Sequence, residues 1–87
     1  MPVSVQLSYE MRKALGVPRV EVEGARTVAD VVRITRERFG PAGERFDELT
    51  RRAAVAVNGI LASYRRGLKT PVTDGDVVAF VKAAAGG

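Results

Sequence analysis

Apolar and polar side chains alternate over residues 3–8, where valine or leucine at every second position is separated by serine or glutamine. This period of two is typical of a strand with one buried face. The alternation returns over residues 20–23 and stops at Gly24, which predicts a second strand. Residues 9–19 would connect the two strands through a short helical turn ending at Gly16. A connection of this length favours an antiparallel pair.

The next segment has the pattern of an amphipathic helix that begins after Thr27. Thr27 is a favourable N-cap, and Asp30 lies where a capping box and the positive end of the helix dipole favour a carboxylate. Gly40-Pro41 predicts the end of the helix, because glycine accepts the left-handed conformation and proline cannot continue a helix. Residues 41–52 are predicted to be irregular apart from a short helical turn. The apolar stripe of the helix comprises Val28, Val31, Val32, Thr35 and Phe39.

Strand patterns return in the last third of the chain. Residues 53–57 are apolar, and Asn58-Gly59 favours a tight hairpin because a type I′ turn needs a positive φ at both positions. After a short returning strand and a long connection, residues 77–81 form a near-continuous apolar run, typical of a central strand. This order of elements predicts an α+β fold. A mixed sheet of four to five strands would pack on one main helix, with the first and last strands adjacent and parallel.

The two faces of the predicted last strand should have different roles. If Val78 and Phe80 point into the core, then Val77, Ala79 and Val81 lie on the opposite face of the sheet. An apolar stripe there, leading directly to the chain end, is a candidate docking surface for a partner protein. The alternatives are that a loop covers the stripe, or that the strand is simply apolar on both faces. The predicted core comprises Val5, Leu7, Val22, Val31, Val32, Phe39, Val57, Val78 and Phe80.

Composition excludes several kinds of chemistry. The 87 residues suffice for one domain, and they include no cysteine and no histidine. Disulfides, zinc-thiolate sites, a cysteine nucleophile and the commonest general base are therefore excluded, and neither a catalytic side chain nor a metal site is expected. Asp74 and Asp76 are too few carboxylates for a calcium site, and we interpret them as part of a turn.

The formal net charge is +4, and the basic residues are spread along the chain. No aromatic pair is placed in a strand to stack bases, so the pattern favours a solvated basic surface over nucleic-acid binding. A basic surface could also attract an acidic protein partner. No apolar run approaches the length of a membrane span, and the first residues lack the pattern of a signal peptide. We therefore expect a cytoplasmic protein with no nucleic-acid or membrane partner.

The last residues differ in composition from the rest, since Lys82 is followed by three alanines and Gly86-Gly87. No side chain after Val81 is suited to anchor this segment in a core. Residues 1–82 are therefore predicted to form the folded domain and residues 83–87 a flexible tail. Glycine has no Cβ, so the diglycine permits a close approach of the backbone in a narrow channel. A frayed terminus is the alternative that terminal glycines alone would favour.

Three segments together resemble the ubiquitin-like sulfur-carrier family, which includes the small subunit of molybdopterin synthase and the thiazole-synthesis carrier. They are residues 27–32 (TVADVV), 55–59 (VAVNG) and 74–80 (DGDVVAF), followed by the short tail. The resemblance spans essentially the whole chain and implies the β-grasp (ubiquitin-like) fold. It also implies that an ATP-dependent activating enzyme adenylates Gly87, with Gly86 giving access, and that a sulfur donor then forms a thiocarboxylate.

Such a carrier supplies no catalytic residue and holds no permanent cofactor, because ATP is used by the activating partner. The resemblance implies that sulfur passes to a synthase subunit, with molybdopterin (molybdenum cofactor) biosynthesis as the first expected pathway. Many molybdopterin-type carriers have Pro-Pro where this chain has Lys82-Ala83-Ala84, and relatives serve thiamine or cysteine synthesis or tRNA thiolation. Two other functions stay open: a protein modifier joined to lysines through Gly87, and an interaction module with an inert tail.

Overall fold

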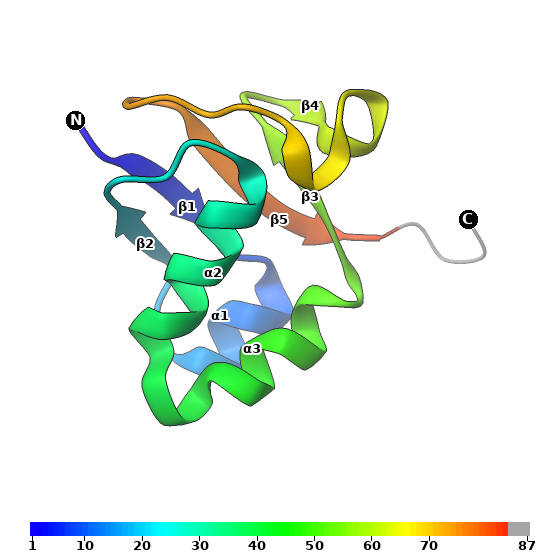
Figure 1. The fold of residues 1–87 in the computed structure, drawn as a ribbon. Coiled ribbons are helices and arrows are strands. Elements are labelled where there is room, and N and C mark those ends of the chain that lie inside the picture. Colours follow the sequence, from blue (N-terminus) through cyan, green and yellow to red (C-terminus); the bar gives the residue numbers. More distant parts are fainter. Residues whose placement is uncertain (84–87) are drawn as a thin grey trace.

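The computed structural model of the chain describes residues 1–83, so the predicted site residues Gly86 and Gly87 lie outside the described part. It shows a five-stranded sheet with the strand order β2-β1-β5-β3-β4 (Figure 1). The elements are β1 (Val3–Gln6), α1 (Tyr9–Leu15), β2 (Arg19–Val22), α2 (Val28–Phe39), α3 (Gly43–Thr50), β3 (Ala53–Val57), β4 (Ile60–Leu61) and β5 (Val77–Lys82), with short 3-10 helices at Gly40–Ala42, Ala62–Tyr64 and Gly67–Lys69.

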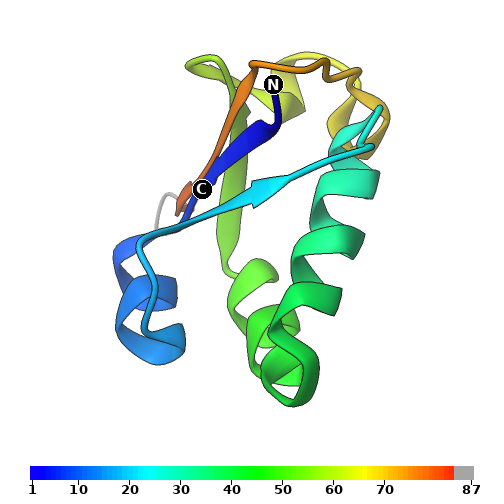
Figure 2. The ribbon, with the colours of Figure 1, turned by 90° about the vertical axis from the view of Figure 1, so that its left-hand side faces the viewer.

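The sheet is mixed, as the sequence pattern predicts. Strand β1 is antiparallel to β2 and parallel to β5, and β5 is antiparallel to β3. The first and last strands are therefore neighbours, and β5 lies in the middle of the sheet. Helices α2 and α3 lie on one side of the sheet, and α1 lies beyond the end of β1 (Figure 2). The predicted α+β architecture with one main helix is confirmed, with five strands.

Helix α2 begins and ends where its local signals predict. The hydroxyl oxygen of Thr27 accepts a hydrogen bond from the Asp30 backbone N–H at 3.2 Å, which caps the helix. The Asp30 carboxylate accepts from the backbone N–H of Arg26 at 3.0 Å, one residue before the position that a capping box would use. The helix ends at Phe39, and Gly40 follows with a φ of 50°.

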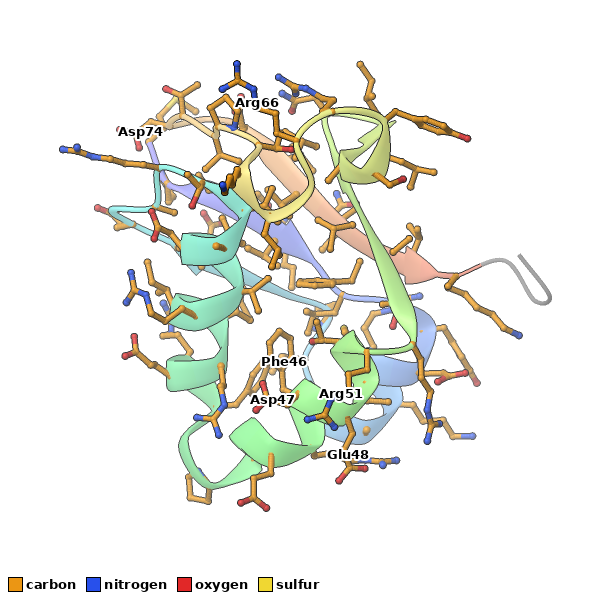
Figure 3. All side chains as sticks on the ribbon, turned by 45° about the vertical axis from the view of Figure 1, so that its right-hand side comes forward. Phe46, Asp47, Glu48, Arg51, Arg66 and Asp74 are labelled. Carbon is orange, nitrogen blue, oxygen red and sulfur yellow. The ribbon has the colours of Figure 1, made fainter. Side chains whose placement is uncertain are left out.

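The prediction of an irregular segment after α2 is wrong, because residues 43–50 form helix α3. Phe46 is fully buried, and its ring lies 5.6 Å from the Phe80 ring and 5.7 Å from the Phe39 ring, centroid to centroid. Asp47 binds Arg36 of α2, with 2.6 Å between Oδ2 and Nε. Figure 3 shows Phe46 directed into the molecule from α3. Aromatic contacts with the end of α2 and with β5 thus anchor this helix in the core.

The core lies between α2, α3 and the inner face of the sheet. Seven of the nine predicted core residues are buried: Val5, Leu7, Val22, Val31, Val57, Val78 and Phe80. The prediction is wrong for Val32 and Phe39, which are only partly buried and pack against the edge of the core. The reason is the orientation of α2, whose fully buried line runs through Val28, Val31 and Thr35. Met11 and Phe46 complete the core from α1 and α3.

Candidate functional site: the tail root and the groove beside it

The root of the predicted tail is held by the centre of the sheet. Pairing between β3 and β5 continues to the end of β5, where Lys82 lies opposite Ala53. One residue further on, the backbone N–H of Ala83 donates to the carbonyl of Arg52 at 3.3 Å. The position and direction of the chain are therefore fixed up to Ala83. The predicted boundary between a domain of residues 1–82 and a flexible tail of residues 83–87 stays a prediction.

The predicted docking residues lie on the outer face of the sheet. Val77 and Ala79 are partly buried, and Val81 is 39% exposed. Ala56 lies opposite Ala79 and Ala54 lies opposite Val81, so both alanines share this face. Helices α2 and α3 cover the other side of the sheet (Figure 2). The docking role of the three residues stays a prediction.

A groove of about 640 Å³ lies between α1 and the end of β5, directly beside the tail root. Ala79 and Val81 line it, whereas Val77 lies outside it. Its remaining lining residues are Gln6, Leu7, Ser8, Tyr9, Glu10, Arg12, Pro18, Arg19, Leu49, Arg52, Ala53, Phe80 and Lys82. The outer face and the tail root thus share one concave surface.

The lining of this groove combines apolar and cationic groups. Core residues Leu7, Leu49 and Phe80 contribute apolar surface, and the exposed ring of Tyr9 adds more. Four cationic side chains and one carboxylate, that of Glu10, also line it. The four cations are Arg12, Arg19, Arg52 and Lys82. In addition, Lys13 Nζ lies 5.9 Å from the centroid of the Tyr9 ring.

Within residues 1–83 the ion pairs lie elsewhere, on α2 and α3. Arg33 pairs with Asp30 and Glu37, Arg36 pairs with Asp47, and Arg45 pairs with Glu48. The backbone hydrogen bond from Arg26 is the main reason why the pKa of the Asp30 carboxyl is lowered. The hydrogen bond to Asp47 raises the pKa of Arg36. In the same part of the chain, no carboxylate lies within ion-pair distance of a groove cation, and the four cations outnumber the single carboxylate of Glu10 in the groove lining.

Sequence reasoning found the outer-face residues but missed the groove. Tyr9 and Arg12 are three residues apart on α1, a spacing that places both side chains on one face of a helix. That spacing was available from the sequence. The presence of Arg52 and Lys82 in the same groove as this helix was not available, because it depends on where α1 lies relative to the end of β5.

Neither a metal site nor a membrane span is found in the described part of the chain. Residues 1–83 hold no group of three or more possible acidic, histidine or cysteine ligands, and none of their helices is long and apolar enough to cross a bilayer. Asp76 instead stabilises a turn. Its carboxylate accepts from the Thr73 backbone N–H at 2.9 Å and from the Asn58 side-chain amide at 3.1 Å. The interpretation of this acidic segment as a turn is confirmed.

The mixed sheet, the helix packed on it and the central position of the last strand, β5, together define a ubiquitin-like β-grasp protein. The ThiS family model matches residues 5–87. The chain therefore belongs to the ThiS family and is a ubiquitin-like sulfur carrier by class. Family membership also supports a carrier rather than a catalyst.

Solved structures agree with this assignment. The chain is similar to one from the crystal structure of the Amycolatopsis orientalis BexX/CysO complex, with a TM-score of 0.75 and 29% identity over 98% of this chain and 99% of that chain. It is also similar to a putative molybdopterin converting factor, subunit 1, from Pyrococcus furiosus, with a TM-score of 0.68 and 26% identity over 97% and 99% of the two chains.

A third similar structure is the small archaeal modifier protein 1 from Methanosarcina acetivorans, with a TM-score of 0.75 and 24% identity over 98% and 95% of the two chains. These likenesses confirm the predicted β-grasp fold. Among curated proteins no match was found.

Proposed function

We propose that this chain carries sulfur on Gly87 as a thiocarboxylate and donates it in cofactor biosynthesis, with molybdopterin as the pathway. The observation that carries the proposal is the match of the ThiS family model through Gly87, at the end of a chain whose tail root leaves the centre of the sheet beside an open apolar face. The likeness to a putative molybdopterin converting factor subunit supports the choice of pathway.

The chemistry begins with the Gly87 carboxylate, which is a poor electrophile. An ATP-dependent activating enzyme overcomes this: a carboxylate oxygen attacks the α-phosphate of ATP and pyrophosphate leaves. Hydrosulfide, the sulfur nucleophile, then attacks the acyl carbon, and AMP leaves with the C–O bonding pair. Loss of the sulfur-bound proton leaves a thiocarboxylate on Gly87. The chain itself supplies no acid, base or metal ligand to either step. Because ATP is the activating substrate, we place this reaction in the cytoplasm.

The described residues position the reacting terminus. The sheet holds the backbone up to Ala83, and the four residues beyond it span at most about 14 Å when extended. An enzyme that takes up Gly87 must therefore lie against the surface around the tail root. The outer-face residues Val77, Ala79 and Val81 lie along the strand that ends there and would dock this enzyme and, later, the sulfur-accepting synthase subunit.

The test is to incubate the protein with the activating enzyme from the same cell, ATP and a sulfide donor, and to measure its intact mass. Replacement of one oxygen by sulfur at Gly87 is expected. Deleting Gly87, or replacing Gly86→Val, should abolish this change, because the carboxylate is displaced or a β-branched side chain obstructs its approach. Gly86→Ala is the matched control and should keep part of the activity, because its side chain is a single methyl group.

Thermal melts should be the same for all tail variants, since the residues that build the core lie before Lys82. Products joined to lysines of other proteins would instead favour a protein modifier. A truncated chain that is activated as well as the wild type would contradict both functions and favour an interaction module.

A further inference from the structure

We propose that the groove between α1 and β5 binds an acidic, partly apolar surface segment of the protein that receives the C-terminus, which is a refinement that rests on the proposed function. The groove overlaps the outer-face stripe at Ala79 and Val81 and extends beyond it to α1, the segment after β1 and the turn before β3. Its position, its charge and its apolar surface each bear on the occupant.

Position makes the occupant a protein that takes up the tail. Lys82 lines the groove, and the next residue is held by the carbonyl of Arg52, which also lines it. A partner that binds Gly87 must approach within about 14 Å of Ala83. The surface around that partner's active site therefore faces the groove whenever the tail is engaged. Because the groove is continuous with the tail root, the partner that binds the tail also contacts the groove.

Charge makes the facing segment acidic. Arg12, Arg19, Arg52 and Lys82 surround the groove, against the single carboxylate of Glu10. The ion pairs of the described residues use none of these four cations. Cations grouped in a concave surface attract an acidic partner and disfavour a basic one, so they contribute to the rate and specificity of association.

Apolar surface adds a second requirement. The ring of Tyr9 is 68% exposed and Val81 is 39% exposed, and both line the groove. An aromatic ring beside cations favours a segment in which acidic residues are interspersed with apolar ones, because the apolar side chains cover the exposed ring. A single-stranded nucleic acid would need several aromatic rings on which bases stack, and Tyr9 is the sole aromatic side chain that lines the groove on its exposed surface.

The first experiment titrates the ¹⁵N-labelled full chain with a capped peptide of repeated glutamate-glutamate-leucine triplets and follows backbone amide shifts by NMR. Shifts confined to the groove, around Tyr9, Ala79 and Val81, are expected. The variant Arg12→Glu/Arg52→Glu should lose them, and Arg65→Glu/Arg66→Glu should keep them. This control makes the same change in charge at the opposite end of the molecule, where Arg66 is seen in Figure 3.

Each other outcome of the titration is decisive. The same peptide with lysine in place of glutamate should cause no shifts, and equal shifts from both peptides would overturn the role of charge. Shifts centred on residues 60–69 would place the acidic contact elsewhere. Tighter binding of total tRNA than of the acidic peptide at the groove amides would make the surface a nucleic-acid site. Thermal melts check the fold, and Lys82→Glu replaces the double variant should the latter unfold.

The second experiment measures the affinity of the same variants for the activating enzyme at two salt concentrations. Reversing the two groove arginines should weaken binding by about tenfold or more at low salt and by less at high salt, with little change in the control. Equal affinities, with normal gain of sulfur, would overturn the groove inference and leave the proposed function standing. Acidic peptide bound in the groove of a chain that never gains sulfur would contradict the proposed function alone.

Discussion

Two neighbouring residues of β5, Phe80 and Val81, have different roles: the first is buried in the core, and the second is exposed where a partner protein could bind. Phe80 is 2% exposed and meets the Phe46 ring edge to face, whereas Val81 is 39% exposed on the other side of the sheet. Their side chains point in opposite directions because successive residues of a strand face opposite surfaces. Substitutions at the two positions should therefore change different properties of the protein.

Phe80→Ala should lower the free energy of unfolding by about 3–5 kcal/mol, from lost burial and the cavity left between Phe46 and β3. Chemical denaturation at neutral pH measures the change. Phe39→Ala is the matched control, because the Phe39 ring also contacts Phe46 but is only partly buried, and its loss should be smaller. A Phe80 variant as stable as the wild type would show that this residue is not in the core.

At the scale of elements, the hairpin between β3 and β4 is linked to the turn before β5. Asn58 has a φ of 51° and Gly59 a φ of 87°, as the predicted turn requires. The Asn58 side chain also accepts from the Val77 backbone N–H at 3.0 Å and donates to the Asp76 carboxylate at 3.1 Å. One residue thus adopts the backbone conformation of its own turn and, through its side chain, fixes the start of the central strand.

Asn58→Ala should lower the free energy of unfolding by about 1–3 kcal/mol, because it strains a positive φ and removes both side-chain hydrogen bonds. Asn58→Gly separates the two causes, since glycine accepts the backbone conformation but makes neither bond. The glycine variant should lose less free energy of unfolding than the alanine variant. Thermal and urea unfolding measure the change in each variant. A glycine variant as unstable as the alanine variant would assign the whole effect to the hydrogen bonds.

At the scale of the whole molecule, the sheet order decides where the chain end leaves. Strand β5 pairs with β1 on one side and β3 on the other, so the tail root leaves the middle of the sheet and not its edge. Strand β1 precedes α1, and the turn before β3 follows α3, so both helices flank the same end (Figures 1 and 2). This arrangement places the cationic groove and the apolar outer face of the sheet next to the tail root.

Val81→Asp should weaken binding to the activating enzyme by about tenfold or more, because it puts an unpaired charge into an apolar contact. The melting temperature should change little, since the side chain is exposed. Ile60→Asp is the control, because Ile60 is 54% exposed on β4 at the edge of the sheet. Calorimetric titration measures the affinity of both variants for the activating enzyme. An unchanged affinity of the Val81 variant would show that this position is not in the interface.

The sequence by itself determined the elements whose causes are local. Four features each depend on a few adjacent residues and were therefore predictable from the sequence: the alternation at β1 and β2, the Thr27 cap, the helix end at Gly40 and the Asn58-Gly59 turn. The apolar run of β5 placed that strand in the centre of the sheet for the same reason. The resemblance carried by residues 27–32, 55–59 and 74–80 gave the fold family.

The tertiary structure alone decided features whose causes are far apart in the sequence. Phe46 anchors helix α3 in the core through its contact with the Phe80 ring, which lies 34 residues further along the chain, and the sequence pattern of residues 43–50 does not contain that partner. Val32 and Phe39 lie at the margin of the core because of the rotation of α2 against the sheet. The groove exists because packing places Arg12 and Arg52 beside the end of β5, and no local pattern specifies that distance.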